Sequence, residues 1–214
     1  MTVFLWKHAL TYVSAPKVAC TSLKHLFFEI ENGRPFVPFQ ANAKNYSVHR
    51  FYPGRPFADL PHADIADHER LCAVRDPVTR LLSCYSNRVV HHQQLHRRRF
   101  TEEMQAAGLR RDPRLAEFID RIDLYRRHFP AVAHHTRPLV DLLGRDPSWY
   151  HGIYPLRALD DFRAHVARVV GHAPALRHLQ SEGPNLTPGD LSTQARRRIE
   201  ALYAEDYAIW GRWL

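Results

Sequence analysis

One lysine and several hydroxyl groups lie close together near the start of the chain, in the segment Ser14-Ala15-Pro16-Lys17-Val18-Ala19-Cys20-Thr21-Ser22. This segment separates an apolar run at residues 9–13, which predicts a strand, from a run at 23–30 that predicts a helix capped by Thr21 or Ser22. A loop that ends at a helix start directs backbone N–H groups at one point, where the helix dipole adds partial positive charge. Lys17 adds a full charge. The pattern therefore predicts a site for a phosphate-bearing or sulfate-bearing anion.

A second group of polar residues follows the apolar run at 70–74, which is typical of a buried parallel strand. Arg75 comes at the carboxyl end of this strand, and ligands of parallel α/β sheets bind outside those ends. Asp76 and Pro77 then form an N-cap and a first helical position. Ser83 lies about two turns into that helix. The planar fork of an arginine and the hydroxyl of a serine suit the two sides of one phosphate.

The elements that must position these groups alternate between strand and helix. We expect strand pieces within residues 4–13, a first helix ending at Asn32-Gly33, and mostly loop at 34–62 with one short strand around 46–51. Further helices are predicted at 77–89, 114–129, 160–170 (closed by Gly171) and 193–207, with turns and a short strand at 136–156. This order predicts an α/β fold with a parallel sheet and a helical C-terminal half.

Composition limits the classes of protein and partner. The chain has 214 residues, of which 45% are hydrophobic, and a formal net charge of +8. These values favour a folded domain with anionic partners, such as nucleotide phosphates, acidic glycans, nucleic acid or an anionic membrane. The three cysteines fit no zinc spacing; Cys72 and Cys84 lie in apolar runs and are interpreted as core residues, and a reducing compartment is expected. No apolar stretch has the length of a membrane span, so we expect a cytoplasmic protein, and the Arg, Ala, His and Pro usage suggests a bacterial source.

Two segments together resemble the PAPS-dependent sulfotransferases, most closely the carbohydrate sulfotransferases and the glycan 2-O-sulfotransferase branch. The segment from Pro16 to Lys24 is similar to their 5′-phosphosulfate-binding loop, and the segment from Val74 to Tyr85 is similar to their 3′-phosphate-binding segment. Leu202-Tyr203 and Asp206-Tyr207 are similar to the end of that family.

This resemblance implies one P-loop-like α/β domain over residues 1–214, with a central parallel sheet flanked by helices. It also implies that the donor is 3′-phosphoadenosine-5′-phosphosulfate (PAPS), the product is adenosine 3′,5′-bisphosphate (PAP), and no metal is required. Lys17 would stabilise charge on the leaving phosphate, and Arg75 and Ser83 would hold the 3′-phosphate. The 5′ end would be held by the loop residues Pro16, Lys17, Val18, Ala19, Cys20, Thr21 and Ser22. The acceptor would be a hydroxyl, most simply that of a sugar or glycan.

The acceptor hydroxyl needs a base, and histidine is the usual choice near neutral pH. In the family such a histidine often precedes the strand that ends in the 3′-phosphate arginine. His49 occupies that place and is the first candidate, with His62 the second. Glu29, Asp59 and Asp64 are weaker candidates. Many carbohydrate sulfotransferases also carry a glutamate before the helix predicted at 160–170, but residues 154–159 contain no carboxylate, so the acceptor site is expected to differ.

Other interpretations stay open at this point. A P-loop kinase or NTPase would share the fold, but residues 14–24 contain no glycine and lack the Walker A pattern. A basic nucleic-acid-binding module fits the charge but shows no recognised motif, and a sulfotransferase fold that only binds PAP is a further alternative. His91-His92 and His96 invite a metal reading, yet only His92 and His96 have helical chelate spacing and no carboxylate sits at the expected offset, so we expect no metal. The acceptor's identity and the oligomeric state are not determined by the sequence.

Overall fold

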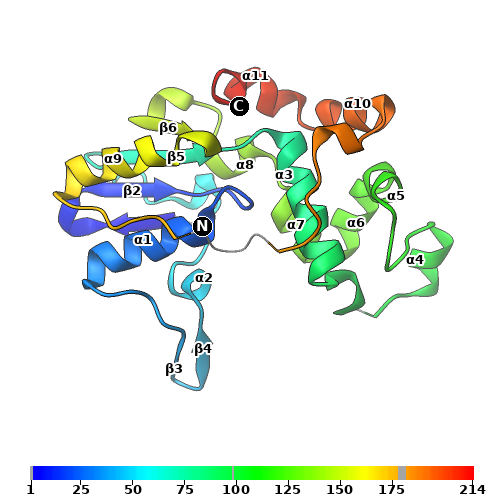
Figure 1. Ribbon diagram of the computed structural model, residues 1–214, viewed down its shortest axis with the longest axis horizontal. Helices are drawn as coiled ribbons and strands as arrows, with labels where there is room; N and C mark the ends of the chain where they lie inside the picture. The colour runs from blue at the N-terminus through cyan, green and yellow to red at the C-terminus, as the bar shows by residue number, and fades with distance from the viewer. Residues whose placement is uncertain (1, 98, 178–181) are drawn as a thin grey trace. The chain divides into compact units, whose positions relative to one another are not determined.

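The computed structural model describes residues 2–97, 99–177 and 182–214 (Figure 1). The chain divides into two compact units. The first comprises Met1–Arg75, Leu139–Gln180 and Ile209–Leu214, and the second comprises Asp76–Pro138 and Ser181–Ala208. A single domain over residues 1–214 stays a prediction.

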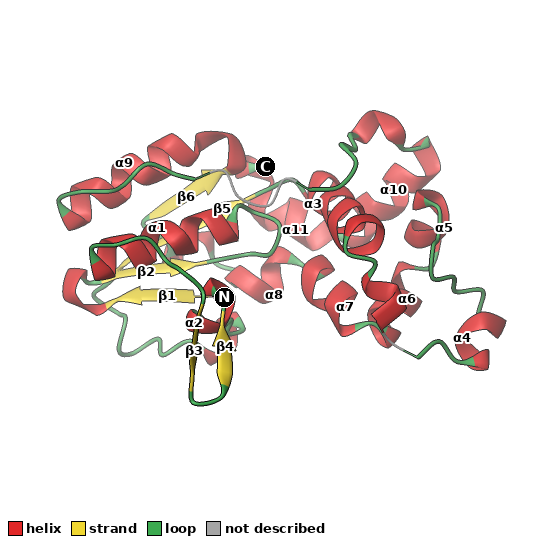
Figure 2. Ribbon diagram, turned by 60° about the horizontal axis from the view of Figure 1, so that its bottom comes forward, coloured by secondary structure: helices red, strands yellow, loops and turns green. Residues whose placement is uncertain are grey.

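The first unit is built on a four-stranded sheet of order β1-β2-β5-β6 (Figure 2). Its strands are β1 (Thr2–Leu5), β2 (Leu10–Val13), β5 (Glu69–Val74) and β6 (Gly152–Pro155). β2, β5 and β6 run parallel to one another, whereas β1 pairs antiparallel with β2 at one edge. The predicted α/β class with a central parallel sheet is thereby confirmed, with an antiparallel edge strand added.

Two helices cover one face of this sheet. Phe27 of α1 (Cys20–Asn32) and Phe162 of α9 (Leu159–Val170) both contact Tyr12 of β2, with ring centroids 5.2 and 5.4 Å from the tyrosine ring. All three side chains are fully buried. Both helices end, as predicted, at a glycine in the left-handed region, Gly33 and Gly171. A short helix that the sequence did not indicate, α8 (Leu139–Leu143), belongs to the same unit.

The predicted strand around residues 46–51 is wrong. A hairpin of β3 (Phe39–Ala41) and β4 (Lys44–Tyr46) is followed by a one-turn helix, α2 (Val48–Phe51). The hairpin loop is Asn42-Ala43, and both residues have positive φ, as in the turn that suits two-residue hairpins. Alanine gives no sequence signal for that turn, so the chain reverses earlier than expected. His49 consequently lies on a helical turn.

The described residues of the second unit form helices and connecting loops and no strand. Its elements are α3 (Pro77–Cys84), a π-helical segment (Tyr85–His91), α4 (Glu102–Ala106), α5 (Leu115–Asp120), α6 (Ile122–His128), α7 (Pro130–Thr136) and α10 (Thr193–Leu202). The last helix, α11 (Ala204–Trp210), begins here. The single helices predicted at 114–129 and 193–207 are each broken in two, at Arg121 and Tyr203. At the second break the Tyr203 ring is buried, and its hydroxyl donates to the Thr136 carbonyl at 2.6 Å.

Two other expectations concern the cysteines and membrane-spanning helices. Cys72 and Cys84 are buried, as predicted, and Cys20 is buried as well. Among the described residues, no helix has both the length and the apolar character that crossing a bilayer demands.

Candidate functional site

The loop between β2 and α1 has a strained backbone. Lys17 and Ala19 have φ values of +66° and +47°, in the left-handed region that residues with a Cβ adopt at a cost of about 1–2 kcal/mol each. The side chains of Ala15 and Val18 are buried in the hydrophobic core and anchor the loop, while Lys17 is partly exposed. Strained non-glycine residues persist where the surroundings enforce them, and they concentrate at functional sites.

This backbone path changes how α1 begins. The N-cap is Ala19, which offers no side-chain cap, so the expectation that Thr21 or Ser22 caps the helix is wrong. The helix begins at Cys20, so Thr21 and Ser22 both lie in its first turn. Their side chains are buried, at 9% and 8% exposure. Because no side chain of the N-cap occupies the helix start, its N–H groups and dipole suit an anionic ligand.

Arg75 is brought to this loop by the sheet. β2 and β5 are parallel neighbours in which Val13 lies opposite Cys72, so their carboxyl ends meet at one edge. Arg75 follows β5 directly, and its Nη1 donates to the carbonyl oxygen of Lys17 at 3.2 Å. The loop 14–22 and the segment that begins at Arg75 are thus joined by a direct hydrogen bond.

The rest of the second segment belongs to the second unit. As predicted, Asp76 caps α3 by accepting from the Thr79 amide at 2.9 Å, and Pro77 takes the first helical position. Tyr207 donates its hydroxyl to the other oxygen of Asp76 at 2.8 Å. Ser83 lies on α3 and is half-buried.

A buried ion pair in the second unit was not predicted. Arg80 of α3 and Asp206 of α11 are 1% and 0% exposed, and their Nη2 and Oδ2 atoms are 3.9 Å apart. The same Nη2 donates to the Arg137 carbonyl at 2.6 Å, and the guanidinium lies over the Tyr203 ring. Residues 203, 206 and 207 of the C-terminal pattern therefore all contact α3 residues or their cap.

His49 lies beside the loop. Its Nε2 is 2.9 Å from Thr21 Oγ1 in the first turn of α1, and its Nδ1 is 3.3 Å from the Nζ of Lys24. Lys24 is completely buried, and its Nζ also donates to the Tyr52 carbonyl at 2.7 Å. Burial lowers the pKa of Lys24 to about 8. Sequence reasoning missed Lys24, although its spacing from Phe27 and Phe28 places it on the apolar face of the helix.

His62 lies elsewhere in the first unit. It is exposed, its Nε2 is 3.0 Å from the Phe57 carbonyl, and its ring packs against Trp149 with centroids 5.6 Å apart. Trp149 precedes β6, and its carbonyl accepts from Arg70 at the start of β5 at 2.8 Å. These contacts place His62 at the amino ends of the parallel strands, whereas the Lys17 loop is at the carboxyl ends. The structure does not bring His62 and Lys17 together.

The weaker carboxylate candidates are also remote from the loop or exposed. Glu29 lies in the last turns of α1 and pairs with Arg177 at 3.6 Å. Asp59 and Asp64 are exposed in the segment that carries His62.

Histidines of the second unit form a separate cluster. His91, His92 and Glu182 have ligating atoms that all lie within 4.8 Å of one another, so the fold supplies a carboxylate that the sequence spacing did not. His96 instead faces Asp112, with Nε2 2.8 Å from Oδ1. The helical chelate of His92 with His96 is therefore not what the fold forms.

The fold is α/β, and the Lys17 loop connects strand β2 to helix α1 at the carboxyl edge of the sheet. The family model described as "Sulfotransferase family" matches residues 2–211, so the chain belongs to the sulfotransferase family. Membership identifies it as a transferase of sulfuryl groups with a hydroxyl acceptor. Comparison with curated proteins gives no match, and comparison with solved structures gives none either.

Proposed function

We propose that this protein transfers the sulfuryl group of PAPS to a hydroxyl of a sugar or glycan, by in-line displacement at the Lys17 loop. The observation that carries the proposal is the hydrogen bond from the Arg75 guanidinium to the Lys17 carbonyl. It links the loop suited to the 5′ end of the donor with the arginine suited to its 3′-phosphate. A donor with anions at both ends of one nucleoside matches that pair of groups.

The loop residues would act on the 5′ end. The start of α1 and the amides of Val18, Ala19, Cys20 and Thr21 would bind the phosphosulfate. Lys17 would stabilise the negative charge that grows on the bridging oxygen as the sulfur–oxygen bond breaks. In such group transfers the protein mainly positions the reactants and stabilises charge, as in phosphoryl transfer.

Arg75 and Ser83 would bind the 3′-phosphate. The guanidinium has five N–H donors, so the bond to the Lys17 carbonyl leaves donors for a phosphate. The hydroxyl of Ser83 would add one hydrogen bond. ATP has no 3′-phosphate, so these two residues would distinguish PAPS from ATP.

His49 is the base candidate that the geometry favours over His62. Its contact with Thr21 Oγ1 at 2.9 Å places the imidazole beside the first turn of α1, where the 5′ end of the donor would bind. An acceptor hydroxyl attacking the sulfur in line would approach this side of the loop. His62, at the other end of the strands, has no such contact.

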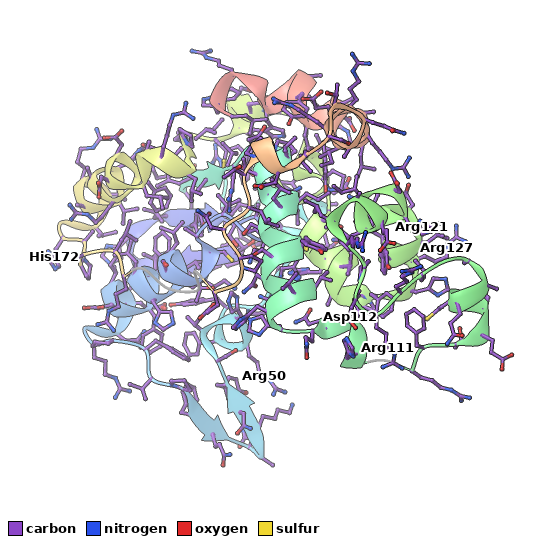
Figure 3. All side chains as sticks on the ribbon, turned by 45° about the vertical axis from the view of Figure 1, so that its right-hand side comes forward. Arg50, Arg111, Asp112, Arg121, Arg127 and His172 are labelled. Atoms are coloured by element: carbon purple, nitrogen blue, oxygen red, sulfur yellow. The ribbon has the colours of Figure 1, made fainter. Side chains whose placement is uncertain are left out.

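The β3–β4 hairpin supports a sugar as the acceptor. Phe39 and Tyr46 stack with ring centroids 5.0 Å apart, and the Arg50 guanidinium lies 5.6 Å from the Tyr46 centroid. Figure 3 labels Arg50 next to the hairpin. Arg50 is the immediate neighbour of His49. Residues 32–58 include no aspartate or glutamate, and they carry the cationic side chains of Arg34, Lys44, Arg50 and Arg55. Aromatic faces and cations suit an acidic sugar.

The test is calorimetry with PAP and with ATP. We expect PAP to bind, ATP to bind at least tenfold more weakly, and Arg75→Ala to weaken PAP binding by about tenfold to a hundredfold, because hydrogen bonds to charged groups contribute about 1.5–3 kcal/mol. Arg34→Ala is the matched control, since Arg34 is exposed beyond the C-terminal end of α1, far from the loop at its start.

Equal binding of ATP and PAP would favour a kinase or NTPase. Salt-dependent DNA binding without PAP binding would favour the basic binding module. Tight PAP binding with no turnover of PAPS on any acceptor would favour the non-catalytic alternative.

A further inference from the structure

Both ring nitrogens of His49 contact polar side chains of α1. Nε2 is 2.9 Å from Thr21 Oγ1, and Nδ1 is 3.3 Å from Lys24 Nζ. A neutral imidazole has one N–H and one lone pair, so one of these contacts must be donated by the ring and the other accepted by it. Which of the two nitrogens carries the proton depends on its partners.

The charge state of Lys24 decides between the two tautomers. A lysine ammonium has three donors and no acceptor, so Nδ1 must accept its hydrogen bond. The imidazole proton then lies on Nε2 and is donated to Thr21 Oγ1. In that state Nε2 has no lone pair with which to take a proton from an acceptor alcohol. A neutral amine, by contrast, accepts a hydrogen bond from Nδ1–H, and Nε2 then carries a lone pair.

We propose that Lys24 is a positioning residue that sets the tautomer of His49, so that His49 can accept a proton only when Lys24 is a neutral amine. This inference rests on the proposed function. In the transfer step the acceptor oxygen forms a bond to sulfur, and the bond from sulfur to the bridging oxygen breaks. The proton of the acceptor hydroxyl moves to His49 Nε2, the bonding electrons stay on the PAP phosphate, and the imidazolium later returns the proton to water.

The surroundings of Lys24 make both charge states accessible near neutral pH. Burial lowers the pKa of its ammonium to about 8, and the nearby Cys20 acts weakly in the opposite direction. Two groups face the Lys24 ammonium: the imidazole of His49 on α2, and the carbonyl of Tyr52, the residue that follows α2. The hydroxyl of Tyr52 donates to Glu31 at 2.7 Å.

The direction of the pH dependence follows from this lowered pKa. The neutral fraction of Lys24 rises with pH through about 8, from about one tenth at pH 7 to about one half at pH 8. We therefore expect kcat to rise about fivefold over that interval.

Long-range ¹H–¹⁵N NMR of the imidazole in the full chain tests the tautomer directly, with His49→Gln used to assign the signals. We expect the Nε2–H tautomer at pH 7 and a shift toward Nδ1–H by pH 9. Lys24→Met should abolish that shift, while Lys7→Met, which removes an exposed lysine just after β1, should retain it. Lys24→Gln, which keeps a polar but non-titrating group, replaces Lys24→Met if the latter does not fold. An Nδ1–H tautomer at pH 7 in the unmodified protein would overturn the inference, and so would an unchanged shift in the Lys24 variants.

The kinetic arm separates this inference from the proposed function. With PAPS and an acceptor sugar, the Lys24 variants should lose the fivefold rise in kcat between pH 7 and pH 8, and Lys7→Met should keep it. A tautomer shift in a protein that does not bind PAP would sink the proposed function and leave the coupling of Lys24 to His49 intact. Turnover of PAPS with the same pH profile in the Lys24 variants would sink the inference alone.

Discussion

Removing the carboxylate of Asp206 should strongly destabilise the second unit. Asp206 and Arg80 are 0% and 1% exposed, so Asp206→Ala leaves a guanidinium buried without its counter-ion. Breaking a buried ion pair from one side costs about 3–5 kcal/mol of unfolding free energy. The bond from Arg80 to the Arg137 carbonyl and its contact with the Tyr203 ring hold the guanidinium in place, so it cannot turn out to water without losing both.

Urea unfolding, followed by far-UV circular dichroism, measures this loss. With a slope of about 2–3 kcal/mol per molar urea, the midpoint of the second unit should fall by about 1–2 M. The double variant Arg80→Met with Asp206→Leu is the matched control, because it removes both charges and should recover most of the loss. A midpoint for Asp206→Ala within 0.3 M of the unmodified protein, taken as roughly 1 kcal/mol or less, would refute the reasoning.

Three further outcomes follow from the first unit. Lys17→Ala should lower kcat by about a hundredfold to a thousandfold and change PAP affinity far less, because the charge of Lys17 acts mainly in the transition state. Steady-state kinetics measure kcat and calorimetry measures PAP affinity; an unchanged kcat would contradict this role. Ala19→Gly should leave the unfolding free energy unchanged or raise it by up to about 1 kcal/mol, because glycine adopts the φ of +47° without strain, whereas Ala19→Val should lower it. A higher melting temperature for Ala19→Val than for Ala19→Gly would contradict the strained loop. Gly152→Ala should destabilise by about 1–3 kcal/mol, because a Cβ there would lie 2.7 Å from Tyr154 Cε2 and 2.9 Å from Leu71 Cδ2; an unchanged melting temperature would count against this packing.

Local signals in the sequence were enough for the elements around the loop. The run at 70–74, the Asp76-Pro77 helix start and the glycine stops at 33 and 171 each depend on residues within a few positions, and the structure contains all of them. The approach of Arg75 to the Lys17 loop could also be expected, because parallel strands bring their carboxyl ends to one edge.

What the sequence could not show depends on residues distant along the chain. The hairpin at Asn42-Ala43 uses positive φ at an alanine, so neither the turn nor the helical placement of His49 had a local signal. The contact of His49 with Lys24 joins residues 25 positions apart. The breaks at Arg121 and Tyr203 interrupt continuous helical patterns, and the second coincides with a side chain bonded to Thr136, 67 positions away.

The network on the α9 side of the sheet is a second example. His165 of α9 contacts the Tyr154 hydroxyl through Nδ1 at 2.5 Å and Glu69 Oε1 through Nε2 at 2.7 Å. These residues come from α9 and two neighbouring strands, β5 and β6, and Tyr154 begins the segment 154–159 that contains no carboxylate. Tyr154 in that segment thus takes part in a polar network that links α9 to the sheet. Only the fold brings its members together.

The central claim is that one nucleotide is held at its two ends by the Lys17 loop and by Arg75. Phosphorus NMR of PAP bound to the protein tests it most directly, because the 3′ and 5′ phosphorus atoms give separate signals. We predict that both signals shift on binding, that Arg75→Ala reduces the shift of the 3′ signal, and that Lys17→Ala reduces the shift of the 5′ signal. A 3′ signal that is unaffected by Arg75→Ala, or a bound PAP whose 5′ signal ignores Lys17→Ala, would contradict the account.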